Sequence, residues 1–481
     1  MPLIIFSLYL MCLIYLAVLG QKSKVSNTPK DFYLANSSLG VLVLFATIFA
    51  SLYSGNTMIA FPAKAYRMGY AYTMCVTFMV VMISVQLLYA PALRRISQKH
   101  NFITPSDWIL HRYKDMRLTL VVAAVFTFAL LNYLLAQLIA VGHAFSGLTG
   151  GQIPYAFGVF FLAIIIVLYE TIGGMRAVAW TDILQGLLMI FGITLLGFYI
   201  LSLRTELHAL PIEILAVDPL KVYPPDGHTI RLWVSTVIIM GIGGALFPQG
   251  IQRIYAAKSI LNLKKALLVL LFTPFIMTFF AYLIGLFGIP LFPGLEGFES
   301  DEIMSLVMRE LSKDGFIIEF GVAILMVGIL AAMMSTADSI LLSLSSILVL
   351  DFYAKTNKTK VSEEKLLHMG KVASWVVIAI LAFIALNSHI TLWRLIEIKI
   401  EYSIQIAPAF ILGLYWKQLS AKPALQGIII GIAITTLGLL SSTGKWWGIH
   451  PGLVGLIINL AICYWGTTKQ SLSQKVITKN T

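Results

Sequence analysis

Carboxyl and hydroxyl groups stand inside one of the most apolar stretches of this sequence. The stretch GVAILMVGILAAMMSTADSILLSLSSILVL carries Asp338 together with Ser335, Thr336 and Ser339. A second carboxylate, Asp182, follows the start of another apolar stretch. Ionisable groups in such surroundings are costly and mark a path for an ion or a substrate. Three roles are open for Asp338: binding a second ion, carrying a proton, or making a plain hydrogen bond.

The composition indicates a membrane protein. Of the 481 residues, 59% are hydrophobic and 12% are charged, whereas soluble proteins contain about 25% charged residues. Apolar runs long enough to cross a bilayer recur along the chain. The net charge of +12 comes from basic residues in the short gaps between these runs, which is typical of cytoplasmic loops and not of nucleic-acid binding. We expect a lipid bilayer and a small-molecule substrate as partners, with no nucleic acid and no required protein partner.

The apolar runs predict an all-α polytopic membrane protein with about thirteen transmembrane helices. They are expected at 3–19, 39–63, 71–93, 118–146, 153–172, 178–201, 231–251, 266–291, 317–350, 370–388, 392–415, 424–442 and 452–467. Successive loops between the predicted helices lie on opposite sides of the membrane. The loops on one side hold 24 of the 34 Lys and Arg residues, and those on the other side hold 8. The positive-inside rule then places the N-terminus outside and the C-terminus in the cytoplasm, as an odd number of helices requires.

Two of the predicted helices contain helix-breaking residues at membrane depth. The second contains Ser54, Gly55 and Pro62, and the seventh contains several glycines before Pro248. Non-helical backbone in a bilayer is tolerated where it lines a cavity or is buried in protein. A matched pair of such helices points to the binding site of a secondary transporter. The alternative is that the glycines only allow close helix packing. Because the breaks are five helices apart, helices 2–6 and 7–11 would form two inverted repeats.

Further charged residues lie in or beside the predicted helices. Glu170 and Arg176 flank the turn between the fifth and sixth helices, where they could form a gate salt bridge. Glu397 and Glu401 are four residues apart and share a helical face. A structural pairing of these glutamates with Lys399 or with a basic residue elsewhere is as well supported as a role in substrate binding.

Two segments carry a family resemblance. The segments GGMRAVAWTDILQ and ILAAMMSTADSILLSLSSILVLDFY resemble the sodium:solute symporter family, which includes the bacterial proline and pantothenate carriers and the sodium–glucose cotransporters. The likeness extends over nearly the whole chain. It implies a LeuT-type core of five plus five helices in inverted repeats, with one additional N-terminal helix and two additional C-terminal helices. It also implies a transporter and not an enzyme, with Na⁺ as the co-transported ion.

The resemblance implies a set of sodium ligands. In the family the main sodium site lies between the unwound segment of the second helix and the ninth helix of this chain. The matching residues are Ala50, Tyr53 and Ala332, through backbone carbonyls, and Ser335 and Thr336, through hydroxyls. Sodium is a hard cation that binds oxygen ligands, and an unwound helix exposes unpaired carbonyls. Ser335 and Thr336 follow Ala332 by three and four residues, which puts all three on one helical face.

Some members of the family use a second sodium site. The matching residues here are Asp182, Ser335, Asp338 and Ser339, although the family more often has a hydroxyl or a neutral residue in place of Asp338. For Asp182 a structural alternative is open, because the helix dipole favours a carboxylate near a helix start.

Polar groups beside the two breaks are the candidates for binding the substrate. They are Ser54, Gly55, Asn56, Thr57, Gln137 and Gln249. The proline carriers have an acidic residue where this chain has Leu52 and an aromatic residue where it has Ile242, so proline is not favoured. Too few side chains converge for a sugar. A small carboxylate-bearing solute fits better, because an exposed helix end can hold an anionic group.

We therefore expect a sodium-coupled secondary symporter that imports a small organic solute, such as an amino acid or a monocarboxylate, by alternating access across a bacterial inner membrane. The chain, 1–481, is expected to be a single transporter domain. Its parts are helix 1 at 3–19, repeat one at 39–201, repeat two at 231–415, C-terminal helices at 424–467 and a cytoplasmic tail at 468–481. The alternatives are a proton-coupled carrier, a sugar or vitamin symporter of the same fold, a transporter-like sensor and a channel.

Overall fold

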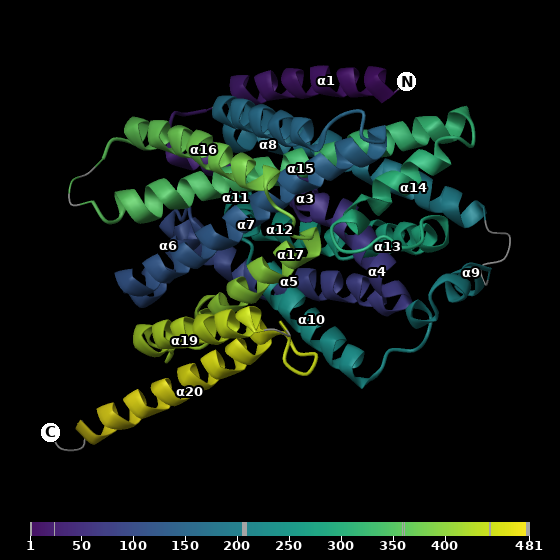
Figure 1. Ribbon diagram of the computed structural model, residues 1–481. Coiled ribbons are helices and arrows are strands. Elements are labelled where there is room, and N and C mark those ends of the chain that lie inside the picture. Colours follow the sequence, from purple (N-terminus) through teal and green to yellow (C-terminus); the bar gives the residue numbers. More distant parts are fainter. Residues whose placement is uncertain are drawn as a thin grey trace.

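The computed structural model describes residues 2–23, 25–203, 209–357, 359, 361–441 and 444–477, and of residues 2–7, 17, 18, 21, 56, 148, 169, 172, 173 and 470–477 it describes the backbone only. Almost all of the described chain is helical (Figure 1). This agrees with the apolar composition, because a backbone in a bilayer must satisfy its own hydrogen bonds.

The helices follow one another with short connections. The first part of the chain contains α1 (Pro2–Lys22), α2 (Pro29–Leu34), η1 (Ala35–Ser37), α3 (Val41–Leu52), η2 (Asn56–Ala60), α4 (Phe61–Met68), η3 (Gly69–Thr73), α5 (Met74–His100), α6 (Pro105–Tyr113), α7 (Met116–Thr149) and α8 (Tyr155–Ser202). The middle part contains α9 (Ala209–Val217), η4 (Pro219–Lys221), α10 (Gly227–Ala245), α11 (Pro248–Ala256), α12 (Ile260–Leu270), α13 (Pro274–Leu291), η5 (Glu299–Glu302) and α14 (Ile303–Leu311). The last part contains α15 (Phe316–Ser346), η6 (Ile347–Ala354), α16 (Glu363–Leu386), α17 (Leu392–Ser403), η7 (Ile404–Ile406), α18 (Ala407–Phe410), η8 (Leu412–Leu414), α19 (Ala421–Leu440) and α20 (Pro451–Ile477).

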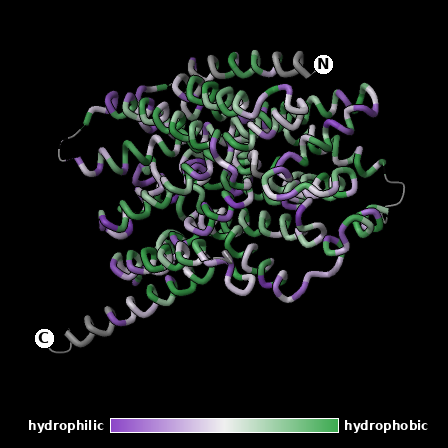
Figure 2. The backbone as a smooth tube through the Cα atoms, in the orientation of Figure 1, coloured by the Kyte–Doolittle hydropathy of each residue, from purple (hydrophilic) through white to green (hydrophobic). Residues whose placement is uncertain are grey.

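Nine helical stretches of the described chain are long and apolar enough to cross a bilayer. They are Thr57–His100, Met116–Gly147, Gly174–Ser202, Gly227–Ala245, Ile260–Leu291, Phe316–Ala354, Glu363–Leu386, Ala421–Leu440 and Pro451–Lys469. Two shorter apolar helices, Val41–Leu52 and Tyr155–Leu168, accompany them. Hydrophobic residues run along the middle of the molecule, and hydrophilic ones gather toward two opposite sides (Figure 2). The protein is therefore an all-helical, multi-pass membrane protein.

Helix α15 lies in the centre of the molecule, where it contacts α8, α7, α3 and α11 (Figure 1). Every described residue from Ala331 to Ser346 on this helix is buried. Helix α1 packs on α8 at one edge, and α19 and α20 pair with each other at the opposite edge. The hydroxyl-rich segment of α15 thus faces other helices along its whole length and does not face lipid.

The second predicted helix is interrupted between α3 and α4, as the sequence predicts. Helix α3 ends at Tyr53, whose ψ of 86° leaves the helical region. Ser54, Gly55 and the π-helical turn η2 then precede α4. A side chain at position 55 would bring its Cβ within 2.9 Å of the Met333 side chain, so glycine allows the unwound segment to approach α15 closely.

The seventh predicted helix is interrupted directly before Pro248, within the stretch of glycines and proline that the sequence indicates. Gly241, Gly243 and Gly244 remain inside α10, and the backbone leaves the helix at Leu246 and Phe247, directly before α11. A Cβ at any of the three glycines would lie within 2.8 Å of a neighbouring helix. The glycines therefore provide close packing, while Pro248 at the first position of α11 marks the break.

The seventh helix also extends further than the sequence predicts, and this corrects the placement of one charge. Helix α11 continues to Ala256, whereas the expected helix ends at residue 251. Arg253, which the sequence places in a cytoplasmic loop, lies inside α11 and is completely buried.

The fifth and sixth predicted helices are the two parts of α8. They meet at Gly174, whose φ of 57° and ψ of −160° interrupt the helical geometry. Only glycine adopts this conformation readily, and a Cβ there would also approach Phe32 within 2.8 Å. The turn leads into the second part of α8, where the carboxylate of Asp182 accepts a hydrogen bond from Thr47 of α3.

Candidate functional site

Oxygen atoms from α3 and α15 meet beside the first break. Because α3 stops at Tyr53, the last carbonyls of this helix lack the partners that a continuous helix would give them. The carbonyl of Ala50 accepts a hydrogen bond of 3.3 Å from the hydroxyl of Thr336 on α15. Ala50, Tyr53, Ala332 and Thr336 are all buried. Two of the expected sodium ligands, one from each element, are therefore in direct contact.

Ser335 lies on the same turn of α15 but its hydroxyl is directed elsewhere. It donates a hydrogen bond to the carboxylate of Asp182 on α8. The same carboxylate accepts from the hydroxyl of Thr47 on α3. Ser335 therefore lies between the expected first ion site and the expected second one, and its hydroxyl is directed to the second.

Arg253 supplies the positive charge beside Asp182. One guanidinium nitrogen lies 3.8 Å from the Asp182 carboxylate, and both side chains are completely buried. The same guanidinium donates to the carbonyl and the hydroxyl of Thr47, to the carbonyl of Gln249 and to the hydroxyl of Ser339. A buried charge needs such compensation, because removing it from water without a partner is very unfavourable.

Ser339 and Asp338 differ in their relation to the polar groups around Asp182. The hydroxyl of Ser339 lies 3.1 Å from that of Ser51 and is also bonded by Arg253, so it belongs to the polar network around Asp182. Asp338 is completely buried on α15, and the hydrogen bonds that the structure defines at Asp182 come from Thr47 and Ser335. Participation of Asp338 in a second ion site stays a prediction.

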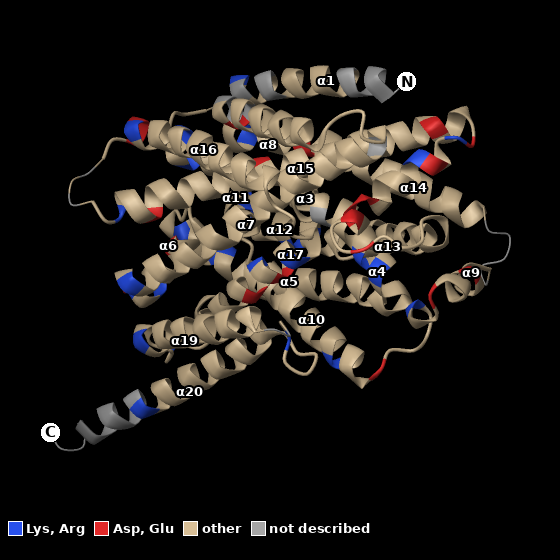
Figure 3. Ribbon diagram, viewed as in Figure 1, with Lys and Arg blue, Asp and Glu red and all other residues tan. Residues whose placement is uncertain are grey.

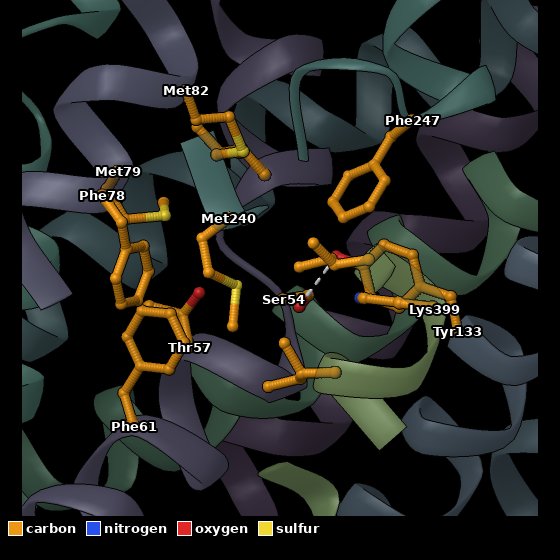
Figure 4. Close-up of a pocket in the computed structure, with 13 residues that line it drawn as sticks. Ser54, Thr57, Phe61, Phe78, Met79, Met82, Tyr133, Met240, Phe247 and Lys399 are labelled. Atoms are coloured by element: carbon orange, nitrogen blue, oxygen red, sulfur yellow. Dashed lines mark hydrogen bonds between the residues drawn. The ribbon is translucent and has the colours of Figure 1, made fainter. Parts of the chain in front are cut away.

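Some of the residues expected to bind the substrate line a cavity, and others hold the unwound segment beside it. Ser54 and Thr57 line a cavity beside the first break (Figure 4). Gly55 donates its backbone N–H to the side-chain oxygen of Gln137 at 3.0 Å, so these two residues hold the unwound segment in place. Gln249 is buried at the start of α11. The side chain of Asn56 lies outside the described residues.

The cavity lies between the two breaks. Its walls come from η2 and α4, from α5 and α7, and from α10 and α17. Its lining residues are Leu52, Ser54, Thr57, Phe61, Phe78, Met79, Met82, Tyr133, Met240, Phe247, Ile396, Lys399 and Ile400. A mostly apolar cavity with a few convergent polar groups is the usual form of a small-molecule site, and here it stands next to the oxygen atoms of α3 and α15.

A comparison with models of protein families shows to which family this chain belongs. The model of the sodium:solute symporter family matches residues 32–431, which is most of the chain. This chain belongs to the sodium:solute symporter family. The resemblance drawn from the sequence is thereby confirmed, and the protein is a membrane transporter, not an enzyme.

Curated relatives and solved structures support the assignment of this symporter over most of its length. The sodium/pantothenate symporter of Haemophilus influenzae is 25% identical over 441 residues, which cover 89% of this chain and 88% of that protein. The high-affinity proline transporter PutP of Bacillus subtilis is 27% identical over 421 residues, which cover 85% and 86%. The substrate-bound, outward-open structure of a Na⁺-coupled sialic acid symporter has a TM-score of 0.79 at 19% identity and covers 97% of both chains. MhsT in complex with L-phenylalanine has a TM-score of 0.57 at 14% identity and covers 88% of this chain and 98% of its own. These two structures show that the fold is of the LeuT type.

Two cations of the symporter's interior could not be placed from the sequence. Arg253 looked like a loop residue because the helix was expected to end two positions before it. Lys399 looked like a partner for Glu397 or Glu401, which lie on the same helix. The sequence did indicate that Lys399 lies in an unusual helix, because LWRLIEIKIEYS carries many charges for an apolar segment. The number of charges does not show which side chain contacts which neighbour.

The two glutamates of α17 are paired outside the cavity. Glu397 lies 2.8 Å from the Lys445 ammonium and accepts a hydrogen bond of 2.7 Å from the Trp393 indole. Glu401 lies 2.9 Å from a ring nitrogen of His450 and accepts from the backbone N–H of Gly452. Both therefore have a structural pairing with residues elsewhere, one of the two interpretations that the sequence leaves open.

The symporter also has a salt bridge at the turn within α8, but it joins residues other than those expected. Arg176 pairs with Asp31 of α2 at 3.0 Å, and Glu170 accepts a hydrogen bond of 3.4 Å from Ser374 on α16. Burial works to raise the pKa of the Asp31 carboxyl, but the N–H of Ser26, the Arg176 guanidinium and the N–H of Val25 outweigh it and hold this pKa below its ordinary value.

Proposed function

We propose that this chain imports a small organic solute together with Na⁺ by alternating access. The observation that carries the proposal is the contact between the Thr336 hydroxyl and the Ala50 carbonyl at 3.3 Å. It joins the hydroxyl-rich central helix to an interrupted helix at the level of a solute-sized cavity. A hard monovalent cation between these oxygens would bind more tightly when α3 and α15 are close together. Ion binding would thereby favour one arrangement of the two helices.

The proposed sodium site consists of the carbonyls of Ala50, Tyr53 and Ala332 and the hydroxyls of Ser335 and Thr336. All five residues are buried, and they come from the two elements that border the cavity. A solute in the cavity and an ion in this site would stabilise the same closed arrangement. Each would then increase the affinity for the other by the same factor, as thermodynamic linkage requires, and a coupling of about 1–3 kcal/mol is typical.

The proposed architecture has thirteen membrane-spanning helices. This number follows when α3 and α4, α10 and α11, and α12 and α13 are each treated as one interrupted helix and α8 is divided at Gly174. Repeat one, 39–201, and repeat two, 231–415, would then each begin with a helix that contains a break. The additional helices are α1, α19 and α20. The proposed location is a bacterial inner membrane.

The sodium site is tested by measuring ion-dependent stability. We expect sodium to raise the unfolding temperature of the purified protein in nanodiscs more than potassium does, because a specific ion stabilises the state that binds it. Ser335→Ala and Thr336→Ala should each raise the sodium concentration at half effect by about tenfold or more. This follows because an interaction with a charged group is worth roughly 1.5–3 kcal/mol and about 1.4 kcal/mol is tenfold.

Ser345→Ala is the matched control for this test. Ser345 is buried on the same helix, and its hydroxyl donates to the carbonyl of Leu342 within α15, so its removal should leave the sodium dependence unchanged. A normal sodium dependence in both site variants would contradict the proposed ligands. Stabilisation by protons in place of sodium would favour the proton-coupled alternative.

A further inference from the structure

A lysine without a counter-ion stands in the wall of the cavity. Lys399, on α17, is 2% exposed. Its ammonium nitrogen lies 2.9 Å from the centre of the Tyr133 ring and 4.8 Å from that of Phe247, as Figure 4 shows. Among the described residues, no hydrogen bond or ion pair of this ammonium group is found. Glu397 and Glu401 of the same helix are engaged by Lys445 and His450.

The surroundings of Lys399 compensate only part of its charge. An ammonium group over an aromatic ring gains about 2 kcal/mol or more when it is removed from water. Moving an uncompensated charge out of water costs considerably more than this. None of the thirteen residues that line the cavity is an aspartate or a glutamate. The site is therefore incomplete in charge, and a negatively charged ligand group is the chemical feature that would complete it.

Two hydroxyls border the cavity. Ser54 and Thr57 line the cavity from the unwound segment, and Tyr133 connects this segment to Lys399, since its hydroxyl donates to Ser54 at 3.1 Å. The opposite wall consists of Phe61, Phe78, Met79 and Met240, which Figure 4 shows grouped away from Lys399. A ligand that matches both walls has an anionic end toward Lys399 and an apolar end toward the phenylalanines and methionines.

The size of the cavity limits the ligand. The cavity measures about 380 Å³ when its opening to solvent is included, and the centre of a water molecule fits in only about 40 Å³ of it. One bound water needs roughly 10–15 Å³ by that measure. In this conformation the cavity therefore accepts a solute of only a few heavy atoms.

We propose that Lys399 binds the carboxylate of the transported solute, and that this solute is a small monocarboxylate with an apolar tail and no amino group. The inference rests on the proposed function, because it assigns the solute of that site. An amino acid would bring an ammonium group into a cavity that already holds a cation and has no acidic side chain. A carboxylate alone would receive the ammonium group of Lys399 as a donor beside the hydroxyl of Ser54, which Figure 4 shows on the same side of the cavity, and charge-assisted hydrogen bonds of this kind are the strong ones.

The test uses four compounds of nearly equal size, namely butyrate, butyramide, butylamine and 2-aminobutyrate. The full-length protein in nanodiscs is titrated with each compound at a fixed sodium concentration, and the unfolding temperature is recorded. We expect butyrate to stabilise the wild-type protein with an apparent Kd at least tenfold lower than those of the other three. Lys399→Met retains the length of the apolar stem and removes the charge, and we expect it to weaken butyrate at least tenfold. In this variant the apparent Kd of butyrate should lie within about twofold of that of butyramide.

Lys445→Met is the matched control, because it removes a lysine that pairs with Glu397 outside the cavity. It should retain the preference for butyrate. The proposal is overturned if butyramide, butylamine or 2-aminobutyrate stabilises the wild-type protein as well as butyrate does. It is also overturned if Lys399→Met keeps the preference, or if butyrate fails to stabilise a protein that sodium stabilises. Loss of the sodium effect alone, with the butyrate preference intact, would instead contradict the proposed sodium coupling.

Discussion

At the scale of single residues, the interior of this symporter is organised around two buried cations with different surroundings. Arg253 donates to Thr47, Gln249 and Ser339 and faces Asp182, so its charge is balanced within the protein. Lys399 contacts aromatic rings and has no acidic neighbour in the cavity wall. The first cation therefore stabilises the fold around the proposed ion site, and the second is the residue that we propose as the ligand of an anionic solute.

The charge balance between Arg253 and Asp182 leads to a prediction on stability. Asp182→Asn leaves the buried guanidinium without its counter-charge, and breaking a buried pair in this way costs about 3–5 kcal/mol. We expect a clear loss in unfolding temperature for Asp182→Asn in nanodiscs. The double variant Asp182→Asn/Arg253→Gln should recover part of this loss, because neither charge then remains unpaired.

The double variant also separates structure from transport. If Asp182 has only a structural role, the stabilised double variant should show the wild-type number of sodium ions per cycle. A reduced number, measured from the sodium flux per solute transported, would assign Asp182 to a second ion site. If the loss of unfolding temperature in the double variant equalled the sum of the losses in the two single variants, the pairing of Asp182 with Arg253 would be contradicted.

At the scale of elements, a salt bridge joins α2 to α8 beside the turn at Gly174. Asp31 of α2 accepts hydrogen bonds from Ser26, Val25 and Arg176, and Arg176 follows Gly174 by one half-turn. The salt bridge therefore joins the segment before the first interrupted helix to the start of the half-helix that carries Asp182. Movement of α3 during transport would change this contact.

The Asp31–Arg176 contact predicts a dependence of stability on pH. Because the pKa of Asp31 is lower in the folded protein than in the unfolded chain, its contribution is complete above the unfolded value of about 4. It is lost as the pH falls through the lower folded-state value. We expect Asp31→Asn to be less stable than wild type at pH 7 and at pH 5, and the difference in unfolding temperature to shrink below about pH 4.

A double-mutant cycle with Arg176→Gln provides the control for this prediction. The coupling energy between positions 31 and 176 should be measurable at pH 7 and smaller at pH 3.5, because below about pH 4 Asp31 of the unfolded chain is protonated, and folding must then remove this proton to form the ion pair. A coupling that is the same at both pH values would show that charge is not what joins α2 to α8.

The sequence predicts elements better than it predicts their partners. Local chemistry identified the break at Ser54 and Gly55 and the hydroxyl face of α15, because both depend on residues close together in the chain. In the seventh helix the sequence could assign the break only to a stretch of glycines and Pro248, because the glycines of α10 face Val81, Met82 and Ile400, which are distant in sequence. Arg253 was misplaced for the same reason: burial of a charge depends on a carboxylate 71 positions away, at Asp182. Lys399 could be located in a helix, but only the fold brings Tyr133 and Phe247 to it.

At the scale of the whole molecule, charge distinguishes the two sides of the membrane. Lys and Arg are concentrated on the side of the molecule where α6 lies and where α20 ends (Figure 3). Acidic residues are more frequent on the opposite side, near η5 and α9. There Arg67 of α4 pairs with Asp301 at 3.2 Å, and Asp301 also accepts from the N–H of Leu392 at the start of α17. By the positive-inside rule we propose that the basic side is the cytoplasmic one, and we then expect the segment around α14 to lie outside.

This orientation can be checked by labelling single cysteines from one side of the membrane. Cys12, Cys75 and Cys463 are first replaced by serine or alanine, and Lys313→Cys or Lys417→Cys is then introduced into this background. Both positions are exposed and lie on opposite sides of the proposed membrane. We expect a membrane-impermeant maleimide to label position 313 in intact cells and position 417 only after permeabilisation. The cysteine-free parent should remain unlabelled throughout, and labelling of position 417 in intact cells would contradict the proposed orientation of the protein in the membrane.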